Sequence, residues 1–98
     1  MTLHDAAANG DVAELRRLVA AGVDVDVLDA NGETALFWAA DKGHVEAIRV
    51  LVVELGADKE AKAVNGGTPL HLAAYNGHVE AIKALVQLGV NKEAMTAG

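Results

Sequence analysis

Neither cysteine nor serine occurs among the 98 residues of this chain. A disulfide framework is therefore excluded, and neither a Ser–His nor a Cys–His nucleophile can be assembled. Aromatic residues are almost as scarce, with one Trp, one Tyr and one Phe. No apolar run approaches the roughly 18 residues of a membrane span, and no signal-peptide pattern follows Met1. These absences predict a non-catalytic cytoplasmic protein and leave a nuclear location open.

Basic residues are few, because 8 Lys and Arg stand against 14 Asp and Glu for a net charge of −6. Most of the acidic excess lies in residues 1–49, whose net charge is −5, whereas residues 50–98 carry −1. A chain with this balance repels nucleic-acid phosphates and anionic lipids. We therefore expect no nucleic acid and no membrane among its partners.

Metal-ligand spacing is also missing. The four histidines form neither an HxxxH nor an HExxH pattern, and His44 and His78 recur in the same sequence context, which is typical of structural residues. The acidic segment 23–33 could suggest a calcium loop, but such a loop needs an oxygen side chain at its fifth position. Counting from Asp24, that position is Leu28. We predict no metal, no cofactor and no catalytic residue, and interpret these acids as a solvated loop.

What the chain does contain is a helix pair encoded by residues 68–89, TPLHLAAYNGHVEAIKALVQLG. Thr68 can cap a helix whose first position suits Pro69, and Asn76-Gly77 provides its end. A second apolar stripe then follows His78. Its members are Val79, Ile82, Leu85 and Val86. The segment therefore predicts two consecutive helices.

This pattern recurs upstream at shifts of 34 and then 33 residues. Residues 43–48, GHVEAI, match residues 77–82, and Gly10, Val12 and Leu15 continue the series. Helices this short are marginal alone in water, so the units must bury one another's apolar faces. Repetition at this period is typical of a helical solenoid.

The stretch TPLHLAAYNGHVEAIKALVQLG resembles the signature of the ankyrin repeat, and TALFWAADKGHVEAIRVLV upstream resembles it as well. The resemblance covers nearly the whole chain. It implies an all-α solenoid of helix–turn–helix units joined by hairpin-like loops, in a single domain with repeats at 1–32, 33–66 and 67–98. It also implies a protein–protein interaction module or scaffold that binds a protein partner on its concave face.

Transferring the family's contact positions to this chain places the candidate site on two loops and on the ends of the first helices. We call segment 23–33 the first finger and segment 57–67 the second finger. The transferred candidates are Ala30, Asn31, Glu33, Asp41, Lys42, Val64, Asn65, Gly67, Tyr75 and Asn76, and Ala8 and Asn9 extend the row. Trp38 joins them as a candidate aromatic hot spot. The acids among them favour a partner surface that is basic or of mixed charge.

The second repeat departs from the pattern at two aromatic residues. Phe37 stands where the third repeat has His71, the position whose histidine bonds to the loops in the family, so that polar link should be lost. Phe37 and its neighbour Trp38 either fill space between repeats or form part of a binding hot spot.

The second repeat also has one extra residue. Leu51 aligns with Leu85 at a shift of 34, whereas Gly56 aligns with Gly89 at a shift of 33. One added residue turns the following side chains by about 100°. We expect a looser turn or bulge near Val52-Val53 to absorb it.

The two ends of the stack differ. The first repeat has the polar Asp5 where the others have Trp38 and Leu72. The third repeat has no polar closing unit, so four of its side chains should be partly uncovered: Leu72, Leu85, Val86 and Leu88. Uncovered apolar surface predicts weak homodimerisation through this repeat. The alternative to a binding module is therefore a structural fragment or engineered minimal stack with no partner beyond itself.

Overall fold

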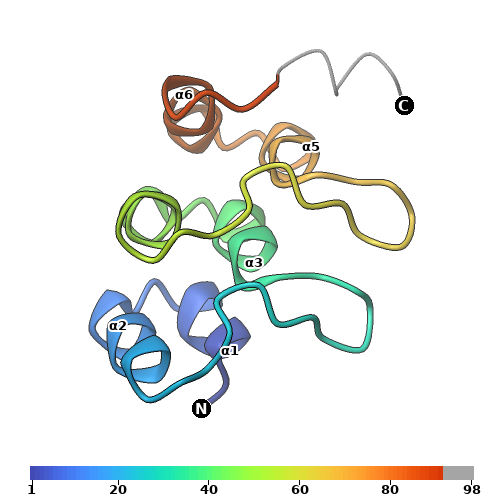
Figure 1. Ribbon diagram of the computed structural model, residues 1–98. Helices are drawn as coiled ribbons and strands as arrows, with labels where there is room; N and C mark the ends of the chain where they lie inside the picture. The colour runs from blue at the N-terminus through green and yellow to red at the C-terminus, as the bar shows by residue number, and fades with distance from the viewer. Residues whose placement is uncertain (92–98) are drawn as a thin grey trace.

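The computed structural model describes residues 1–91, which fold into three helix pairs. The first pair is α1 (Leu3–Ala8) and α2 (Val12–Ala20); the second is α3 (Ala35–Lys42) and α4 (Val45–Arg49), continued by the π-helix η1 (Val50–Glu54); the third is α5 (Pro69–Tyr75) and α6 (Val79–Gln87). The pairs stack in chain order, and both fingers project from one side of the stack (Figure 1). The predicted all-α solenoid is confirmed. The predicted third repeat extends to residue 98, beyond the described residues.

The described residues contain no strand, and each finger is closed by a short turn at its tip. In the first finger the N–H of Asp29 donates to the carbonyl of Glu33 at 2.9 Å, and in the second the N–H of Ala63 donates to Gly67 at 2.8 Å. Within residues 1–91, no helix is both long and apolar enough to cross a membrane.

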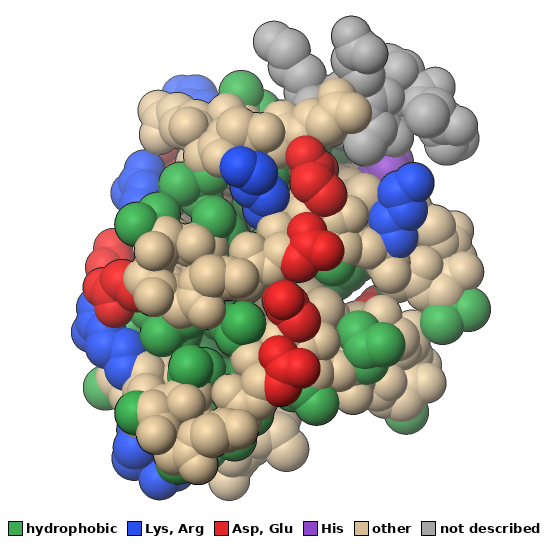
Figure 2. Space-filling model, in the orientation of Figure 1, with side chains coloured by type: hydrophobic (Ala, Val, Ile, Leu, Met, Phe, Trp, Pro, Cys, Tyr) green, Lys and Arg blue, Asp and Glu red, His purple; other side chains and the backbone are tan. Residues whose placement is uncertain are grey.

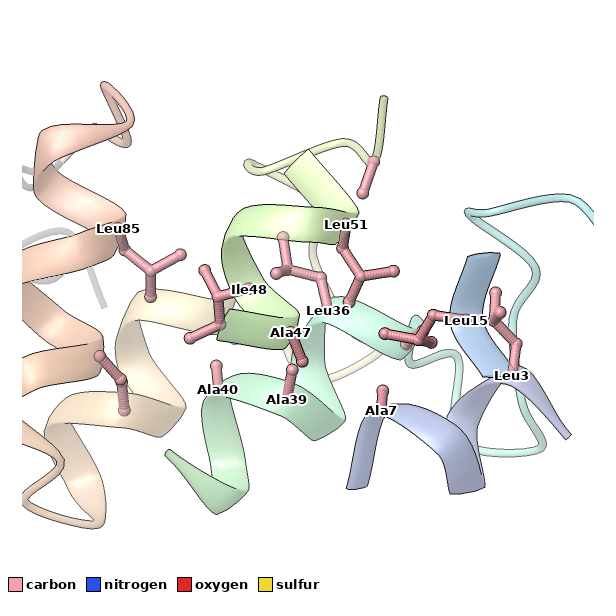
Figure 3. Close-up of a cluster of buried hydrophobic side chains, with 14 of the residues drawn as sticks. Leu3, Ala7, Leu15, Leu36, Ala39, Ala40, Ala47, Ile48, Leu51 and Leu85 are labelled. Atoms are coloured by element: carbon pink, nitrogen blue, oxygen red, sulfur yellow. The ribbon is translucent and has the colours of Figure 1, made fainter. Parts of the chain in front are cut away.

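Alanine allows the first helices of successive pairs to approach closely. α1 lies against α3 and α3 against α5, and the buried residues of these faces include Ala6, Ala7, Ala39, Ala40 and Ala73. Larger side chains from the second helices fill the space behind them, as Figure 3 shows for Leu15, Ile48 and Leu51. The core is therefore continuous through all three pairs, and no pair has a core of its own.

The structure corrects two predictions about the third pair. Leu85 is fully buried, because its side chain points toward Ile48 of the preceding pair (Figure 3). The buried face of α6 consists of Ala81, Ala84 and Leu85, whereas Val79 of the predicted apolar stripe is exposed. Val86 is 38% exposed, which confirms that it is partly uncovered. Leu72 and Leu88 are partly exposed, as predicted.

The extra residue of the second pair is absorbed by η1, as predicted. The N–H of Leu55 donates to the carbonyl of Val50 at 3.0 Å, a five-residue step in place of the α-helical four. The wider turn leaves Val53 68% exposed. It also brings Glu54 to Arg16 on α2, which donates from Nε and Nη2 at 2.8 and 2.9 Å.

Two histidines link successive pairs. His44 donates from Nε2 to the carbonyl of Ala8 at 2.9 Å, and His78 donates to the carbonyl of Asp41 at 2.8 Å. The His78 ring lies so close to Gly43 that a Cβ there would be 2.8 Å from the imidazole, and Gly43 also has a φ of 73°. The structural role predicted from the recurrence of these histidines is confirmed.

The finger acids do more than solvate the loops. Asp24 accepts the N–H of Asp26 at 2.9 Å, and Asp26 in turn accepts the N–H of Asp58 at the base of the second finger at 2.9 Å. The series continues where Glu60 accepts the N–H of Asn91 at 2.7 Å. Figure 2 shows acidic side chains in a column across the stack. These carboxylates fix the spacing between successive loops.

The start of α3 lacks the cap that begins α5. Thr68 accepts the N–H of His71 at 3.3 Å, and its own N–H donates to Nδ1 of His71 at 3.0 Å. Phe37 occupies the equivalent position in α3 and cannot accept a hydrogen bond. The hydroxyl of Thr34 is consequently buried with no hydrogen-bond partner, so the predicted loss of a polar link is confirmed.

This difference predicts opposite results for the same substitution at two positions. Thr68→Val should lower the free energy of unfolding by about 1 kcal/mol, because a helix cap is lost. Thr34→Val should leave it unchanged or raise it, because the hydroxyl removed is buried and unsatisfied. Urea denaturation of both variants measures the difference. An equal loss in both would show that the Thr34 hydroxyl is hydrogen-bonded in solution.

Candidate partner-binding groove

A groove of about 550 Å³ lies where the second finger faces α5 and the C-terminal end of the first finger. It is lined by Glu33, Phe37, Lys62, Ala63, Asn65, Gly66, Gly67, Thr68, His71, Leu72 and Tyr75. The space-filling view shows the molecule hollowed between the two fingers (Figure 2). The groove therefore combines an apolar floor with polar walls contributed by two successive loops.

The sequence folds this way because each finger is anchored at its base. His4 of α1 donates from Nε2 to the carbonyls of Val27 and Glu33, at 2.9 and 3.1 Å, and so joins the two sides of the first finger. At the base of the second finger the nearly fully buried Phe37 takes the place of such a histidine. That apolar contact forms part of the groove floor.

Asp29 is the main polar anchor of the first finger. Its Oδ1 accepts the N–H groups of Asn31 and Glu33, both at 2.9 Å, and its Oδ2 accepts the indole N–H of Trp38 at 2.9 Å. Burial raises the pKa of Asp29, but the hydrogen bonds from Glu33, Trp38 and Asn31 outweigh it and hold the pKa below the usual 3.8. The carboxylate therefore ties the tip of the finger to α3.

Glu33 and Lys62 are the groove's unpaired charges. Neither side chain has a hydrogen bond or ion pair with any other part of residues 1–91. Burial raises the pKa of Glu33 above its usual 4.5, and the negative charges of Asp29 and Asp41 raise it further. The carboxylates of Glu33, Asp29 and Asp41 therefore make the side of the groove that Glu33 lines negative. Lys62, on the second finger, supplies the positive charge of the groove.

The structure brings together only some of the candidate residues. Glu33, Asn65, Gly67 and Tyr75 line the groove. Asp41 and Asn76 contact each other beside it, because the Asn76 amide donates to Asp41 Oδ1 at 2.7 Å, and Lys42 lies 3.8 Å from the same carboxylate. Four candidates at the finger tips or at the end of a first helix are exposed but do not line the groove: Ala30, Asn31, Val64 and Asn9. Trp38 and Ala8 are half-buried, and Trp38 serves to hold Asp29.

Sequence reasoning missed several lining residues, among them Lys62, His71 and Leu72. It also missed the Asp29–Trp38 bond. Residues 29–32, Asp-Ala-Asn-Gly, have the composition of a turn, but nothing local indicates that Asp29 bonds to the indole of Trp38, nine residues later. Residues 1–91 contain no group of three or more His, Asp or Glu able to hold a metal ion. The groove thus combines an exposed phenol, an apolar floor and two unpaired charges.

The Asp29–Trp38 bond can be tested with Trp38→Phe, which keeps an aromatic ring but removes the indole donor. The pKa of Asp29 should rise toward 3.8, and the free energy of unfolding should fall by about 1 kcal/mol at neutral pH. A carboxyl with a lowered native pKa stabilises the fold above its unfolded pKa and loses that contribution as pH falls through the native value. The stability difference from the unsubstituted protein should therefore shrink below about pH 4.

Carboxyl titration by ¹³C NMR and denaturation across acidic pH provide the two measurements. Tyr75→Phe is the matched control, because the Tyr75 hydroxyl has no partner within residues 1–91. That variant should change neither quantity. If the pKa of Asp29 were the same with and without the indole, the bond would not hold the finger in solution.

Comparison with known proteins agrees with this architecture. Residues 3–96 match the family described as Ankyrin repeats (3 copies). The chain is 37% identical over 49 residues to acyl-CoA-binding domain-containing protein 4 of Oryza sativa subsp. japonica, covering 50% of this chain and 15% of that protein. It is 47% identical over 49 residues to an L-asparaginase of Dirofilaria immitis, covering 50% and 8% respectively. For osteoclast-stimulating factor 1 of Rattus norvegicus the identity is 40% over 52 residues, covering 53% and 24%.

In each case the similarity covers about half of this chain and less than a quarter of the relative. The activities in their names therefore describe those longer proteins. The match over residues 3–96, by contrast, spans all three helix pairs. Ankyrin repeats are generally non-enzymatic modules for protein–protein interaction, and this chain belongs to the ankyrin repeat family.

Proposed function

We propose that this chain is a non-catalytic interaction module or scaffold, cytoplasmic or nuclear, whose groove binds a segment of another protein. The observation that carries the proposal is Tyr75, which lines the groove yet is 89% exposed. A tyrosine that serves only the core would be buried or hydrogen-bonded. Here the phenol stands beside a groove that it does not fill.

The surroundings of Tyr75 resemble the centre of a recognition surface. Leu72 is partly exposed and supplies apolar area, and Asn65 and Gly67 bring polar atoms of the second finger to the same groove. Tyrosine is enriched among the few residues that dominate binding energy, since it offers a large contact area with little side-chain entropy to lose. Of the other candidates, Glu33, Asn65 and Gly67 line the same groove, where a bound segment would exclude water from the phenol.

The test is capture of proteins from a cell lysate, followed by titration of each identified and purified partner. Tyr75→Ala should weaken binding at least tenfold, as expected for a hot-spot residue. Val53→Ala is the control, because it truncates an exposed apolar side chain on η1, away from the groove lining. The proposal is contradicted if Tyr75→Ala leaves every affinity unchanged, or if Val53→Ala weakens binding equally.

The second candidate function, self-association through the third pair, is favoured by exposed apolar side chains on α6. Val79 is 57% exposed, whereas its counterparts Val12 and Val45 are half-buried in the earlier pairs. Val86 is 38% exposed, and its counterparts Val19 and Val52 are likewise half-buried. No helix pair of residues 1–91 covers α6 as the later pairs cover α2 and α4.

Sedimentation at increasing protein concentration tests self-association. The small apolar area on α6 should support only weak pairing, so dimers are expected at high micromolar concentration. Val86→Glu should shift the equilibrium to monomer, whereas Val53→Glu, on the second pair, should not. A protein that stays monomeric throughout, or a dimer that both variants retain, would argue against pairing through this face.

A further inference from the structure

We infer that the groove selects an extended peptide segment of mixed charge, in which a basic side chain pairs with Glu33 beside an apolar residue seated on the groove floor. This inference rests on the proposed function and specifies the chemistry of the partner. Glu33 and the apolar floor line one continuous groove, so a single short segment can contact both.

The cation is assigned to Glu33 because the neighbouring acids are already occupied. Both oxygens of Asp29 accept hydrogen bonds from the finger and from Trp38. Asp41 accepts from the Asn76 amide and lies near the ammonium of Lys42. Of these three carboxylates, only that of Glu33 has no hydrogen-bond or ion-pair partner within residues 1–91.

The occupied acids still contribute their charge. Burial raises the pKa of Glu33, and the negative charges of Asp29 and Asp41 raise it further, so these two acids lie near enough to add to the negative potential at Glu33. Bringing a guanidinium or ammonium group to this position relieves their mutual repulsion and forms a charge-assisted hydrogen bond with Glu33. A neutral side chain of the same size gains neither effect.

Lys62 restricts the partner from the other side. It lines the same groove, and its ammonium has no ion pair within residues 1–91. A uniformly basic segment would place a like charge against it, which disfavours such partners. The preferred segment therefore carries its basic residue at Glu33 and an acidic or neutral residue toward Lys62.

The apolar part of the segment is assigned by the floor. The partly exposed Leu72 presents apolar surface, and the exposed Tyr75 ring offers a face on which an aliphatic stem or a cation can stack. Arginine suits both features, since its planar group can bind a carboxylate through two hydrogen bonds and stack on an aromatic ring. Arginine is thus expected more often than lysine.

The experiment selects peptides from a displayed library of random octapeptides on the full chain and on two charge-reversed variants. Glu33→Lys changes the groove, whereas Glu80→Lys reverses an exposed acid on α6 that contacts Lys83. Both substitutions change the net charge equally. Any general attraction of basic peptides to an acidic protein is therefore the same in the two variants. Glu33→Gln is a milder second variant for the case in which charge reversal impairs folding.

Peptides selected on the unsubstituted chain should be enriched in arginine, and then lysine, beside an apolar residue. Replacing that basic residue by glutamine in a purified peptide should weaken its binding about tenfold. Glu33→Gln should weaken the basic peptide similarly, and Glu33→Lys should abolish the enrichment. Glu80→Lys should preserve both the enrichment and the affinity.

Three outcomes would overturn the inference. If the selected peptides lack a basic preference but still lose affinity with Tyr75→Ala, the groove binds peptides and only the assignment to Glu33 fails. If peptides selected on Glu33→Lys are still enriched in basic residues, the assignment to Glu33 also fails, because the enrichment then comes from the overall charge of the protein. If no selected peptide depends on Tyr75, the proposed function fails together with the inference.

Discussion

The close contact between alanine-rich first helices is the interaction on which this structure depends. α1, α3 and α5 have between six and eight residues each, too few to be stable alone in water. Ala7, Ala39 and Ala40 let them approach until the leucine and isoleucine side chains of the second helices fill the remaining space (Figure 3). Because every helix relies on its neighbour, the three pairs form a single core.

The position of the groove follows from that stacking. Its floor and walls come from the second and third pairs and from both fingers, so it exists only when successive repeats are in register. Polar bonds set that register: His78 binds the carbonyl of Asp41, and Asp26 binds the N–H of Asp58. A partner that occupies the groove would therefore also stabilise the stack, because it contacts elements contributed by separate repeats.

The second pair concentrates the chain's departures from a regular repeat. Phe37 replaces a capping histidine and leaves the Thr34 hydroxyl unsatisfied, yet the same ring contributes to the groove floor. The added residue widens η1 and brings Glu54 to Arg16. In both places a polar or regular feature of the third pair is replaced in the second pair by a different contact.

The sequence by itself determined the helices, their ends and their stacking, because caps, glycine stops and a repeat of 33 to 34 residues are local or periodic signals. The same signals predicted the bulge in η1 and the lost link at Phe37. Only the tertiary structure decided which apolar residues of α6 are buried, since a stripe containing Val79, Leu85 and Val86 does not show which side the preceding pair covers. The groove likewise required the fold. Glu33 and Lys62 line it together, and Asp29 meets Trp38, because separate segments are brought together in space, and no local pattern encodes that proximity.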